Sequence, residues 1–346
     1  MRTTLALALA LAVPSAVRAQ QPKVTQQASG VTLVLEALSP VTENIVWASG
    51  TYGTVLRTLD GGDTWERRPI LGAERLDFRG IHAISANEAW ALSIGNGPAS
   101  RIFHTTDGGT NWTEQFKNAD STAFFDCITF FDAKHGIAYS DASTIGTTIL
   151  RTEDGGVHWA LLPAGDVPTA LKGEGGFASS NSCAISVDSK HGFIGASTPG
   201  ARVFRTDNAG KTWSIAGLVP VIHDSQSGTT ALSFRDAKHG IAVAGHVAGN
   251  MTKDTSSAAV ATTDDGGVTW KLRQRPEQPG MLSGVALMPG VNDKTVITAS
   301  YSGVYVSLDN GDSWTVAATG YMWAVRAVGK RAWAVGRGGQ ITRLDF

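Results

Sequence analysis

The chain has 346 residues and a formal net charge of −1, and 17% of its residues are charged. So small a net charge gives no electrostatic reason to expect nucleic acid or an anionic membrane as a partner. Forty glycines and ten tryptophans, with few segments of helical period, predict many short strands joined by tight turns. We therefore expect an all-β protein.

The first residues are typical of an export signal. Arg2 precedes an apolar run from Leu5 to Val13, and Val17-Arg18-Ala19 ends in a small-residue pattern that signal peptidase accepts. The run is too short to span a bilayer, and no cysteine at the cleavage site indicates a lipid anchor. We expect residues 1–19 to be a signal peptide and the mature protein to be periplasmic or secreted, without membrane insertion.

One pattern occurs six times along the chain: a hydroxyl residue, a spacer, Asp or Asn, a spacer, Gly, two spacers and Trp. The first copy runs from Thr58 to Trp65. The acidic or amide residue and the Trp of the six copies are Asp60 and Trp65, Asp107 and Trp112, Asp154 and Trp159, Asn208 and Trp213, Asp265 and Trp270, and Asp309 and Trp314.

This pattern is the Asp-box, a hairpin turn whose side chains accept backbone N–H groups that the chain reversal leaves unpaired. Gly supplies backbone angles that other residues resist, and the Trp ring packs on apolar neighbours. We interpret these residues as structural, because Asp residues spaced around a ring cannot converge on one substrate. Successive box tryptophans lie 47, 47, 54, 57 and 44 positions apart, which fits one four-stranded propeller blade per repeat.

The third repeat shows how a blade divides into strands A to D. We predict strand A over 124–131, strand B over 136–140 and strand C over 148–152, with strand D beginning at Trp159. The turn between strands A and B also repeats in three blades and contains His135, His191 and His239. Equivalent positions in three blades favour a turn-supporting role for these histidines over a catalytic one.

The chain after the sixth box supplies three further strands, predicted over 323–328, 331–335 and 340–344. The fourth strand of that blade is missing, and residues 23–27 have nowhere else to pair. We therefore predict a seven-bladed β-propeller, one domain over 20–346, whose ring is closed by the N-terminal strand in the last blade. Such closure removes two exposed sheet edges.

The Asp-Gly-Gly boxes, such as Thr152-Glu153-Asp154-Gly155-Gly156, together with the segment 334–339, resemble the photosystem II assembly and stability factor family. The resemblance spans nearly the whole mature chain, whereas Asp-boxes alone also occur in sialidases (as BNR repeats) and in sortilin-like receptors. It implies a seven-bladed propeller that acts without catalysis and docks on a protein partner. The pattern also occurs in exported propellers described as oxidoreductases or glycoside hydrolases, so an enzyme is the alternative.

The best candidate binding site lies near the start of the innermost strands. Alignment of the blades puts Glu36, Arg79 and Asp126 at one level of the central channel, followed by Ser182 and Thr230. Clustered charges in a narrow channel would perturb each other's ionisation, although a water-filled channel with self-neutralising charges is the alternative.

Three long connections, 163–181, 218–228 and 246–257, are expected to form a rim on the same side. In the first, Gly173-Glu174-Gly175-Gly176-Phe177-Ala178 matches a dinucleotide fingerprint as a bare pattern, but a strand rather than a helix is expected after it. We interpret this segment as a loop through which Glu174 or Phe177 reaches a ligand.

Cys127 and Cys183 occupy the same position in adjacent blades, where inner strands approach closely. An oxidising compartment permits a disulfide between them, and two buried free thiols are the alternative. The scattered histidines have no metal-ligand spacing, so we expect no metal and no cofactor. The Arg-Ile-Pro signature of sialidases is absent, Arg101-Ile102-Phe103 being the nearest approach, and no Ser-His-Asp set can be assigned.

These observations lead to one functional hypothesis and one alternative. The leading hypothesis is a non-catalytic, monomeric, exported propeller that binds a protein or peptide partner through its loop-rich face. The alternative is an enzyme, hydrolytic or redox, with its site at the channel mouth around Glu36, Arg79 and Asp126.

Overall fold

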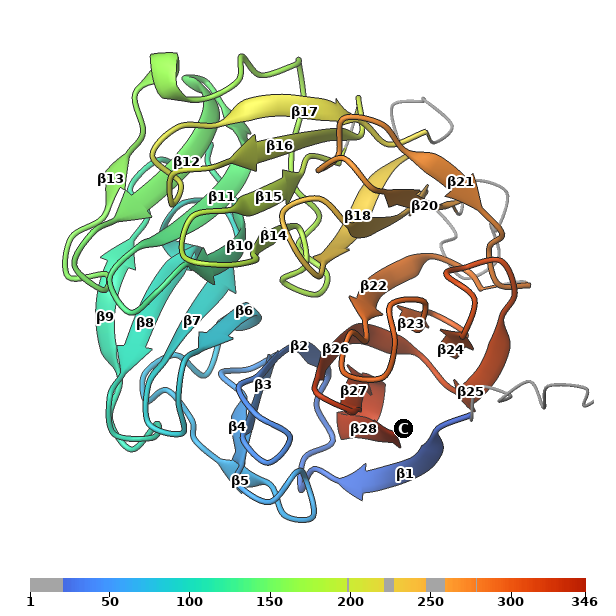
Figure 1. Cartoon of the computed structure of the whole chain (residues 1–346). Coiled ribbons are helices and arrows are strands. Elements are labelled where there is room, and N and C mark those ends of the chain that lie inside the picture. Colours follow the sequence, from blue (N-terminus) through green and yellow to red (C-terminus); the bar gives the residue numbers. More distant parts are fainter. Residues whose placement is uncertain (1–20, 198, 221–226, 247–258, 278) are drawn as a thin grey trace, which may run out of the picture.

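The computed structural model describes residues 21–197, 199–220, 227–246, 259–277 and 279–346. Seven four-stranded antiparallel sheets stand in a ring around a central channel (Figure 1). In each sheet one strand, A, lies nearest the channel, and strands B, C and D follow outward. The predicted seven-bladed β-propeller is confirmed.

The first four blades follow one another along the chain. Blade 1 consists of β2 (Leu35–Pro40), β3 (Val46–Gly50), β4 (Val55–Thr58) and β5 (Glu66–Arg67). Blade 2 consists of β6 (Asp77–Ala83), β7 (Ala89–Ile94), β8 (Arg101–Thr105) and β9 (Thr113–Lys117). Blade 3 consists of β10 (Phe125–Phe130), β11 (Gly136–Ser143), β12 (Gly146–Thr152) and β13 (Ala160–Leu161). Blade 4 consists of β14 (Ala184–Ser186), β15 (Gly192–Gly195), β16 (Arg202–Thr206) and β17 (Ser214–Leu218).

The remaining blades complete the ring. Blade 5 consists of β18 (Ser227–Phe234), β19 (Gly240–His246), β20 (Ala259–Thr263) and β21 (Lys271–Arg273). Blade 6 consists of β22 (Leu282–Leu287), β23 (Val296–Ser300), β24 (Gly303–Ser307) and β25 (Thr315–Thr319). Blade 7 consists of β26 (Met322–Val328), β27 (Arg331–Gly336), β28 (Gln340–Asp345) and β1 (Lys23–Ala28). Short 3-10 turns lie at η1 (Gly97–Ala99), η2 (Ala164–Asp166) and η3 (Arg337–Gly339).

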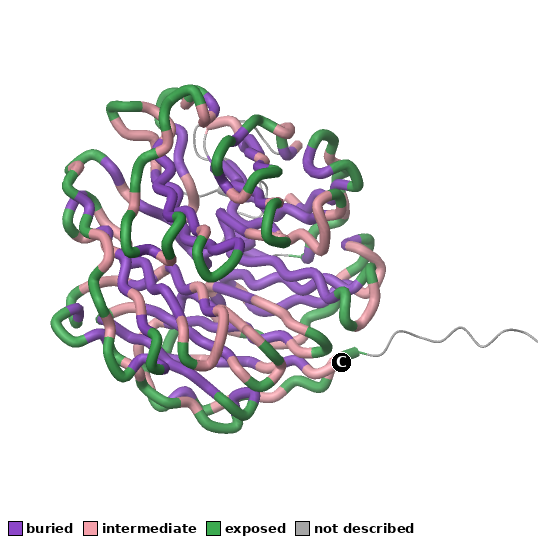
Figure 2. Tube along the Cα trace, turned by 60° about the vertical axis from the view of Figure 1, so that its left-hand side comes forward, coloured by how far each residue is buried: buried purple, intermediate pink, exposed green. Residues whose placement is uncertain are grey.

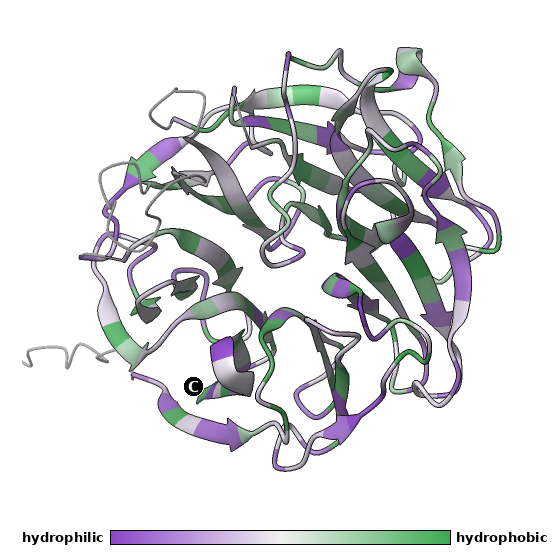
Figure 3. Cartoon of the chain, turned by 180° about the vertical axis from the view of Figure 1, so that it is seen from behind, coloured by the Kyte–Doolittle hydropathy of each residue, from purple (hydrophilic) through white to green (hydrophobic). Residues whose placement is uncertain are grey.

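Burial falls from the channel outward. Every residue of β10 and of β22 is buried, whereas both residues of β5 and of β13 are exposed. Figure 2 shows the buried segments along the strands and the exposed ones at the turns and the outer edge, and Figure 3 shows hydrophobic stretches along the strands. The core therefore lies between blades: inner strands contact the inner strands of their neighbours, and Trp47 of blade 1 shares a cluster with Phe78 of blade 2.

The six Asp-box turns share one hydrogen-bonding pattern. In the first, Thr58 Oγ1 accepts the N–H of Gly62 at 2.8 Å, and Asp60 Oδ1 accepts the N–H of Thr64 at 2.9 Å. The equivalent hydroxyls of the other five boxes accept the equivalent N–H at 2.8 to 3.1 Å. Gly62 has φ of 94°, a conformation that disfavours a side chain. The pattern closes the turn with side chains at most four residues away.

Each box turn also bonds the A-to-B turn of its own blade. The N–H of Gly61, for example, donates to Asn44 O at 2.9 Å, and five further pairs repeat this bond. Both kinds of turn therefore lie on one side of the ring, which we name the box face. The D-to-A and B-to-C connections, such as 162–183 and 144–145, lie on the other side, the loop face.

The three turn histidines contact their own turns. His135, His191 and His239 each place Nδ1 at 2.8 Å from a carboxylate oxygen of the Asp three residues earlier. That Asp also accepts the backbone N–H of its His at 2.8 Å in all three turns. These contacts support the interpretation of the histidines as turn residues.

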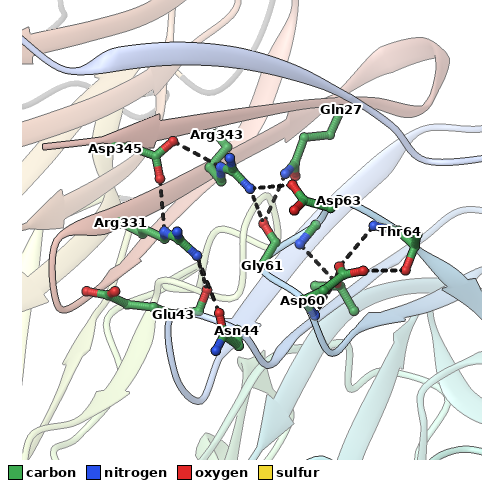
Figure 4. A network of polar contacts seen from close by, with 12 residues as sticks. Gln27, Glu43, Asn44, Asp60, Gly61, Asp63, Thr64, Arg331, Arg343 and Asp345 are labelled. Carbon is green, nitrogen blue, oxygen red and sulfur yellow. Dashed lines mark hydrogen bonds and ion pairs between the residues drawn. The ribbon is translucent and has the colours of Figure 1, made fainter.

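The N-terminal strand closes the ring as predicted. β1 pairs antiparallel with β28 from Lys23 opposite Asp345 to Ala28 opposite Gln340. The seam between blades 7 and 1 is bridged by polar contacts (Figure 4): Gln27 Nε2 and Arg343 Nη1 both donate to Gly61 O at 3.0 Å, and Arg343 Nη1 lies 2.9 Å from Asp63 Oδ1. Both chain ends therefore bond to the first box turn.

Candidate functional site

The innermost strands of six blades share a β-bulge near the loop face. The pairing between strands A and B shifts there by one residue in every blade except blade 4. The bulged residues are Glu36, Arg79, Asp126, Thr230, Ser283 and Trp323. A bulge turns its extra side chain out of the regular alternation and frequently lies beside a functional site. The alignment that predicted one level for Glu36, Arg79 and Asp126 missed Ser283 and Trp323, which occupy the same position in blades 6 and 7.

Two of the three predicted charges meet. Arg79 Nε lies 3.3 Å from Glu36 Oε1 and 3.2 Å from Asp77 Oδ2. Glu36 is 2% exposed, and burial, together with the hydrogen bond to Asp77, raises its pKa to about 9 despite the neighbouring Arg79. At neutral pH Glu36 therefore holds a proton. Asp77 was not predicted, although it lies only two residues before Arg79.

The third predicted charge is elsewhere. Among the described residues no ion pair joins Asp126 to Glu36 or Arg79, and its carboxyl lies instead against that of Asp141. Burial, followed by the charge of Asp141, raises the pKa of Asp126 well above its usual range. The expectation of one three-charge cluster is thus wrong. The reason is packing: Gly176 covers Asp126 so closely that a Cβ there would be 2.7 Å from Asp126 Cγ.

The channel is filled by a segment that the sequence suggested would be a rim. We name residues 175–182 the plug. Ala178 O accepts from Arg79 Nη1 at 3.2 Å in blade 2, Ser179 Oγ donates to Ser283 O at 3.1 Å in blade 6, and Leu232 N of blade 5 donates to Ser182 O at 3.0 Å. One short segment can reach so many blades only along the axis of the ring.

Asn181 is the most connected residue of the plug. Its Oδ1 accepts the N–H of Ile128 at 2.8 Å, and its Nδ2 donates to Ile81 O at 3.1 Å and to Ile128 O at 3.0 Å. Its backbone O accepts from Arg326 Nη2 at 2.7 Å. Asn181 thus joins blades 2, 3 and 7. Of the other long connections, 221–226 and 247–257 lie outside the described residues.

Glu174 does not reach out to a ligand. It is 2% exposed and forms a two-pronged ion pair with Arg202, with Arg202 Nε 2.6 Å from Glu174 Oε1 and Nη2 bonded to Oε2. A buried carboxylate needs such a partner. The buried position of Glu174 therefore contradicts the predicted ligand contact. Its ion pair with Arg202 anchors the base of the plug instead. β14 follows the plug as a strand, so the glycine pattern at 173–176 opens no helix.

A disulfide joins the residue before β14, the strand that follows the plug, to blade 3. Cys127 and Cys183 are bonded, with a Cα–Cα distance of 6.0 Å. Each cysteine directly follows a residue of the bulge level, Asp126 in blade 3 and Ser182 in blade 4. The bond therefore fixes the end of the plug next to the inner strand that the plug covers.

Aromatic rings and arginines gather at the loop face between blades 6, 7 and 2. Tyr301 stacks on Tyr321 with 4.1 Å between ring centroids, and Trp323 meets Tyr301 edge-on at 5.4 Å. Arg79 lies over Trp323 at 5.2 Å, and Arg337 lies over Tyr321 at 3.8 Å. We name these five residues the aromatic–arginine cluster. The indole N–H of Trp323 is buried without a hydrogen-bond partner.

The described part of the chain offers no metal centre, since it holds no group of three His, Cys, Asp or Glu side chains that could bind an ion. No helix among these residues is long and apolar enough to cross a bilayer. Near the loop face, the described residues offer two carboxyl pairs, one arginine between acids, and the aromatic–arginine cluster.

Comparison with known proteins agrees with the resemblance drawn from the Asp-boxes. Residues 23–118 match the family described as photosynthesis system II assembly factor YCF48. No curated protein matches the chain. The match covers blades 1 and 2 together with the closing strand β1. Over these residues the chain is therefore similar to the YCF48 family.

Solved structures resemble the whole ring. A structure of YCF48 bound to D1 peptide is 17% identical, with a TM-score of 0.63 over 96% of this chain and 99% of that one. YCF48 from Cyanidioschyzon merolae is 18% identical, with a TM-score of 0.65 over 93% and 98%. A catalytically inactive virginiamycin B lyase from Staphylococcus aureus with quinupristin is 11% identical, with a TM-score of 0.67 over 94% and 100%. At these identities the likeness shows the fold, which occurs in binding proteins and in enzymes.

Proposed function

We propose that this chain is a non-catalytic propeller that binds a protein or peptide partner at its loop face. The observation that carries the proposal is the aromatic–arginine cluster. Tyr, Trp and Arg are the residues that dominate binding energy at protein interfaces, where they lie in a partly desolvated centre. Arg337 is exposed, and Tyr321 and Trp323 are half-buried, so a partner can contact all three.

The relatives support the same proposal. YCF48 is described as an assembly factor, and one structure of it contains a D1 peptide. By analogy with these relatives, we infer that this chain binds a peptide. The sequence of that peptide is to be found by selection from a library. The plug also argues for surface binding, because it fills the channel through which a small substrate would have to enter.

The test is a selection from random sequences, so the partner need not be identified beforehand. A phage-displayed random peptide library is selected on the wild-type protein, and enriched peptides are titrated against Arg337→Ala and Trp323→Ala. We expect affinity to fall at least about tenfold, which corresponds to about 1.4 kcal/mol. Lys330→Ala is the matched control, because it removes one exposed cation from the box face of the same blade. Peptides that bind all variants equally would contradict the proposal.

A second candidate function is an enzyme with its site at Glu36, Asp77 and Arg79. The observation that favours it is the raised pKa of Glu36, since a protonated carboxyl beside a second carboxyl can act as a general acid. The fold of the virginiamycin B lyase shows that similar rings can carry catalysis. Turnover of a glycoside or a redox dye that disappears in Glu36→Gln would favour the enzyme over the binding protein.

We also propose export to the periplasm or the medium. The apolar segment and small-residue site at residues 1–19, which lie outside the described residues, support it. The disulfide between Cys127 and Cys183 supports it as well, because such bonds persist in oxidising compartments. Mass spectrometry of the secreted or periplasmic protein tests the proposal: a mature N-terminus at Gln20 is expected, and an intact N-terminus in the cytoplasm would contradict it.

A further inference from the structure

A cavity lies at the end of the channel that opens on the box face, on the other side of the plug from the aromatic–arginine cluster. Its volume is about 250 Å³. The ends of inner strands from blades 1, 2, 3, 4 and 7 line it, and the plug forms its floor through Asn181. The polar residues around it are Ser39, His82, Thr129, Ser186, Asn181 and Arg326.

Arg326 brings a charge into this cavity without a counter-charge. Its Nη2 donates to Asn181 O at 2.7 Å, and among the described residues no carboxylate pairs with it. The buried arginines Arg57, Arg151 and Arg202, by contrast, each hold a glutamate. Burial lowers the pKa of Arg326 to about 10, so the guanidinium remains charged at neutral pH. Arg326 is half-buried, and a cation that is partly removed from water and has unused N–H donors favours an anion as its partner.

The rest of the lining leaves that positive charge uncompensated. His82 is the other titratable residue of the lining, and burial, followed by the charge of Arg326, lowers its pKa to about 4. The imidazole is therefore neutral at pH 7, and the cavity contains a single positive charge and no acid. A monoanion balances one charge, whereas a phosphate dianion would need a second cation.

The remaining hydrogen-bond donors point to the same ligand class. Thr129 and Ser186 satisfy each other, with Thr129 Oγ1 donating to Ser186 Oγ at 3.1 Å and Ser186 Oγ donating to Phe130 O at 2.7 Å. Ser39 Oγ accepts the N–H of Ala83 at 2.8 Å, and its own proton has no acceptor among the described residues. The guanidinium, the Ser39 hydroxyl and the neutral His82 ring thus provide donors that no acceptor among the described residues uses.

We propose that this cavity binds a carboxylate, with Arg326 as the group that recognises it. The planar guanidinium fork matches the two oxygens of a carboxylate. The volume lies below the roughly 300 Å³ at which sites for drug-sized ligands begin, so the ligand is a small carboxylic acid or the terminal residue of a peptide. The site is independent of the proposed function, because it lies at the opposite mouth of the channel.

The first experiment measures binding to the full mature protein. Propionate is titrated while the side-chain Nε–H signal of Arg326 is followed by NMR, and heat is measured by calorimetry. We expect saturable binding that weakens at least about tenfold in Arg326→Gln, while Lys330→Ala, an exposed cation four residues along the same blade, binds like the wild type. Peptides with a free or an amidated C-terminus distinguish the two sources: a free-acid peptide that binds more tightly than propionate indicates a chain end, and equal binding indicates a small acid.

The second measurement needs no variant. A bound carboxylate offsets the charge of Arg326, so the pKa of His82 should rise from about 4 when propionate is saturating. The ring-proton shift of His82 against pH, with and without propionate, reports this change. Absence of any saturable shift with tens of millimolar propionate would overturn the proposal, as would equal binding by Arg326→Gln or tighter binding of inorganic phosphate than of propionate.

Discussion

The two faces of the ring are held together in different ways. On the box face each turn is closed by hydroxyl and carboxylate oxygens within four residues, and the same bonds recur in six blades. On the loop face the plug joins residues about a hundred positions apart, as in the bond between Arg79 and Ala178. The regular face stabilises the scaffold blade by blade, whereas the irregular face is built once and can carry a specific function.

Loss of the closing strand should affect both faces and have the largest effect. Deletion of residues 20–29 removes β1, whose six residues all pair with β28. At roughly 1 kcal/mol for each backbone hydrogen bond, the loss of unfolding free energy should be on the order of 5 kcal/mol. Chemical denaturation of the deletion and of a chain that begins at Gln20 measures it. Equal midpoints would show that closure by β1 does not matter for stability.

Loss of the disulfide should weaken the loop face strongly. Cys127 and Cys183 are 56 residues apart, and a loop of that size predicts a loss of roughly 4 kcal/mol when the bond is removed. The double variant Cys127→Ala/Cys183→Ala should therefore unfold at a much lower denaturant concentration. Reduced wild-type protein should behave in the same way. A loss below about 1 kcal/mol would mean that the plug is held without the bond.

Substitution within the plug tests how far the loop face depends on single side chains. Asn181→Ala leaves Ile128 N and Ile81 O without their partners, which should cost about 2 to 3 kcal/mol. Ser180→Ala is the matched control, because the Ser180 hydroxyl is buried without a partner. Its effect on thermal stability should be neutral or slightly favourable. Equal losses in the two variants would contradict the role assigned to Asn181.

Substitution of a single box should have a smaller effect, because each turn is one of six. Asp265→Ala removes the acceptor for the N–H and the hydroxyl of Thr269 and should cost about 1 kcal/mol. Asp264→Ala is the neighbouring control, since Asp264 is exposed and makes no hydrogen bond among the described residues. Melting temperatures compare the two. A loss as large as that of Asn181→Ala would erase the difference between the faces.

Glu36→Gln should have the smallest effect of these changes near pH 4, and its effect grows with pH in a defined way. Folding raises the pKa of Glu36 from its ordinary 4.5 to about 9, so stability is lost as pH rises from about 4.5 toward 9. Glutamine mimics the protonated carboxyl and removes this loss. Melting temperatures should therefore agree near pH 4 and favour the variant increasingly up to pH 9. A constant difference across this range would contradict a protonated Glu36.

The candidate site was only partly predictable. Alignment of the blades placed Glu36, Arg79 and Asp126 at one level, which the shared bulge reproduces, because strand register repeats from blade to blade. The alignment could not show that Asp126 is covered and paired with Asp141, since that depends on the path of a loop with no repeat. The same alignment, extended to blade 7, could have identified Trp323 and Arg326. It did not, because the search was for charged residues at the start of strand A, and blade 7 has none there.

The sequence alone determined the number of blades, the position of the turns and the closure by the N-terminal strand. These features follow from hydrogen bonds within four residues and from strands that recur at a nearly constant spacing. The residues of each repeat therefore specify its own turn and strands. Only the tertiary structure decided that residues 175–182 fill the channel, that Glu174 is buried against Arg202, and that Arg326 has no acid beside it. Those outcomes depend on contacts between segments distant in the chain, which no local pattern encodes.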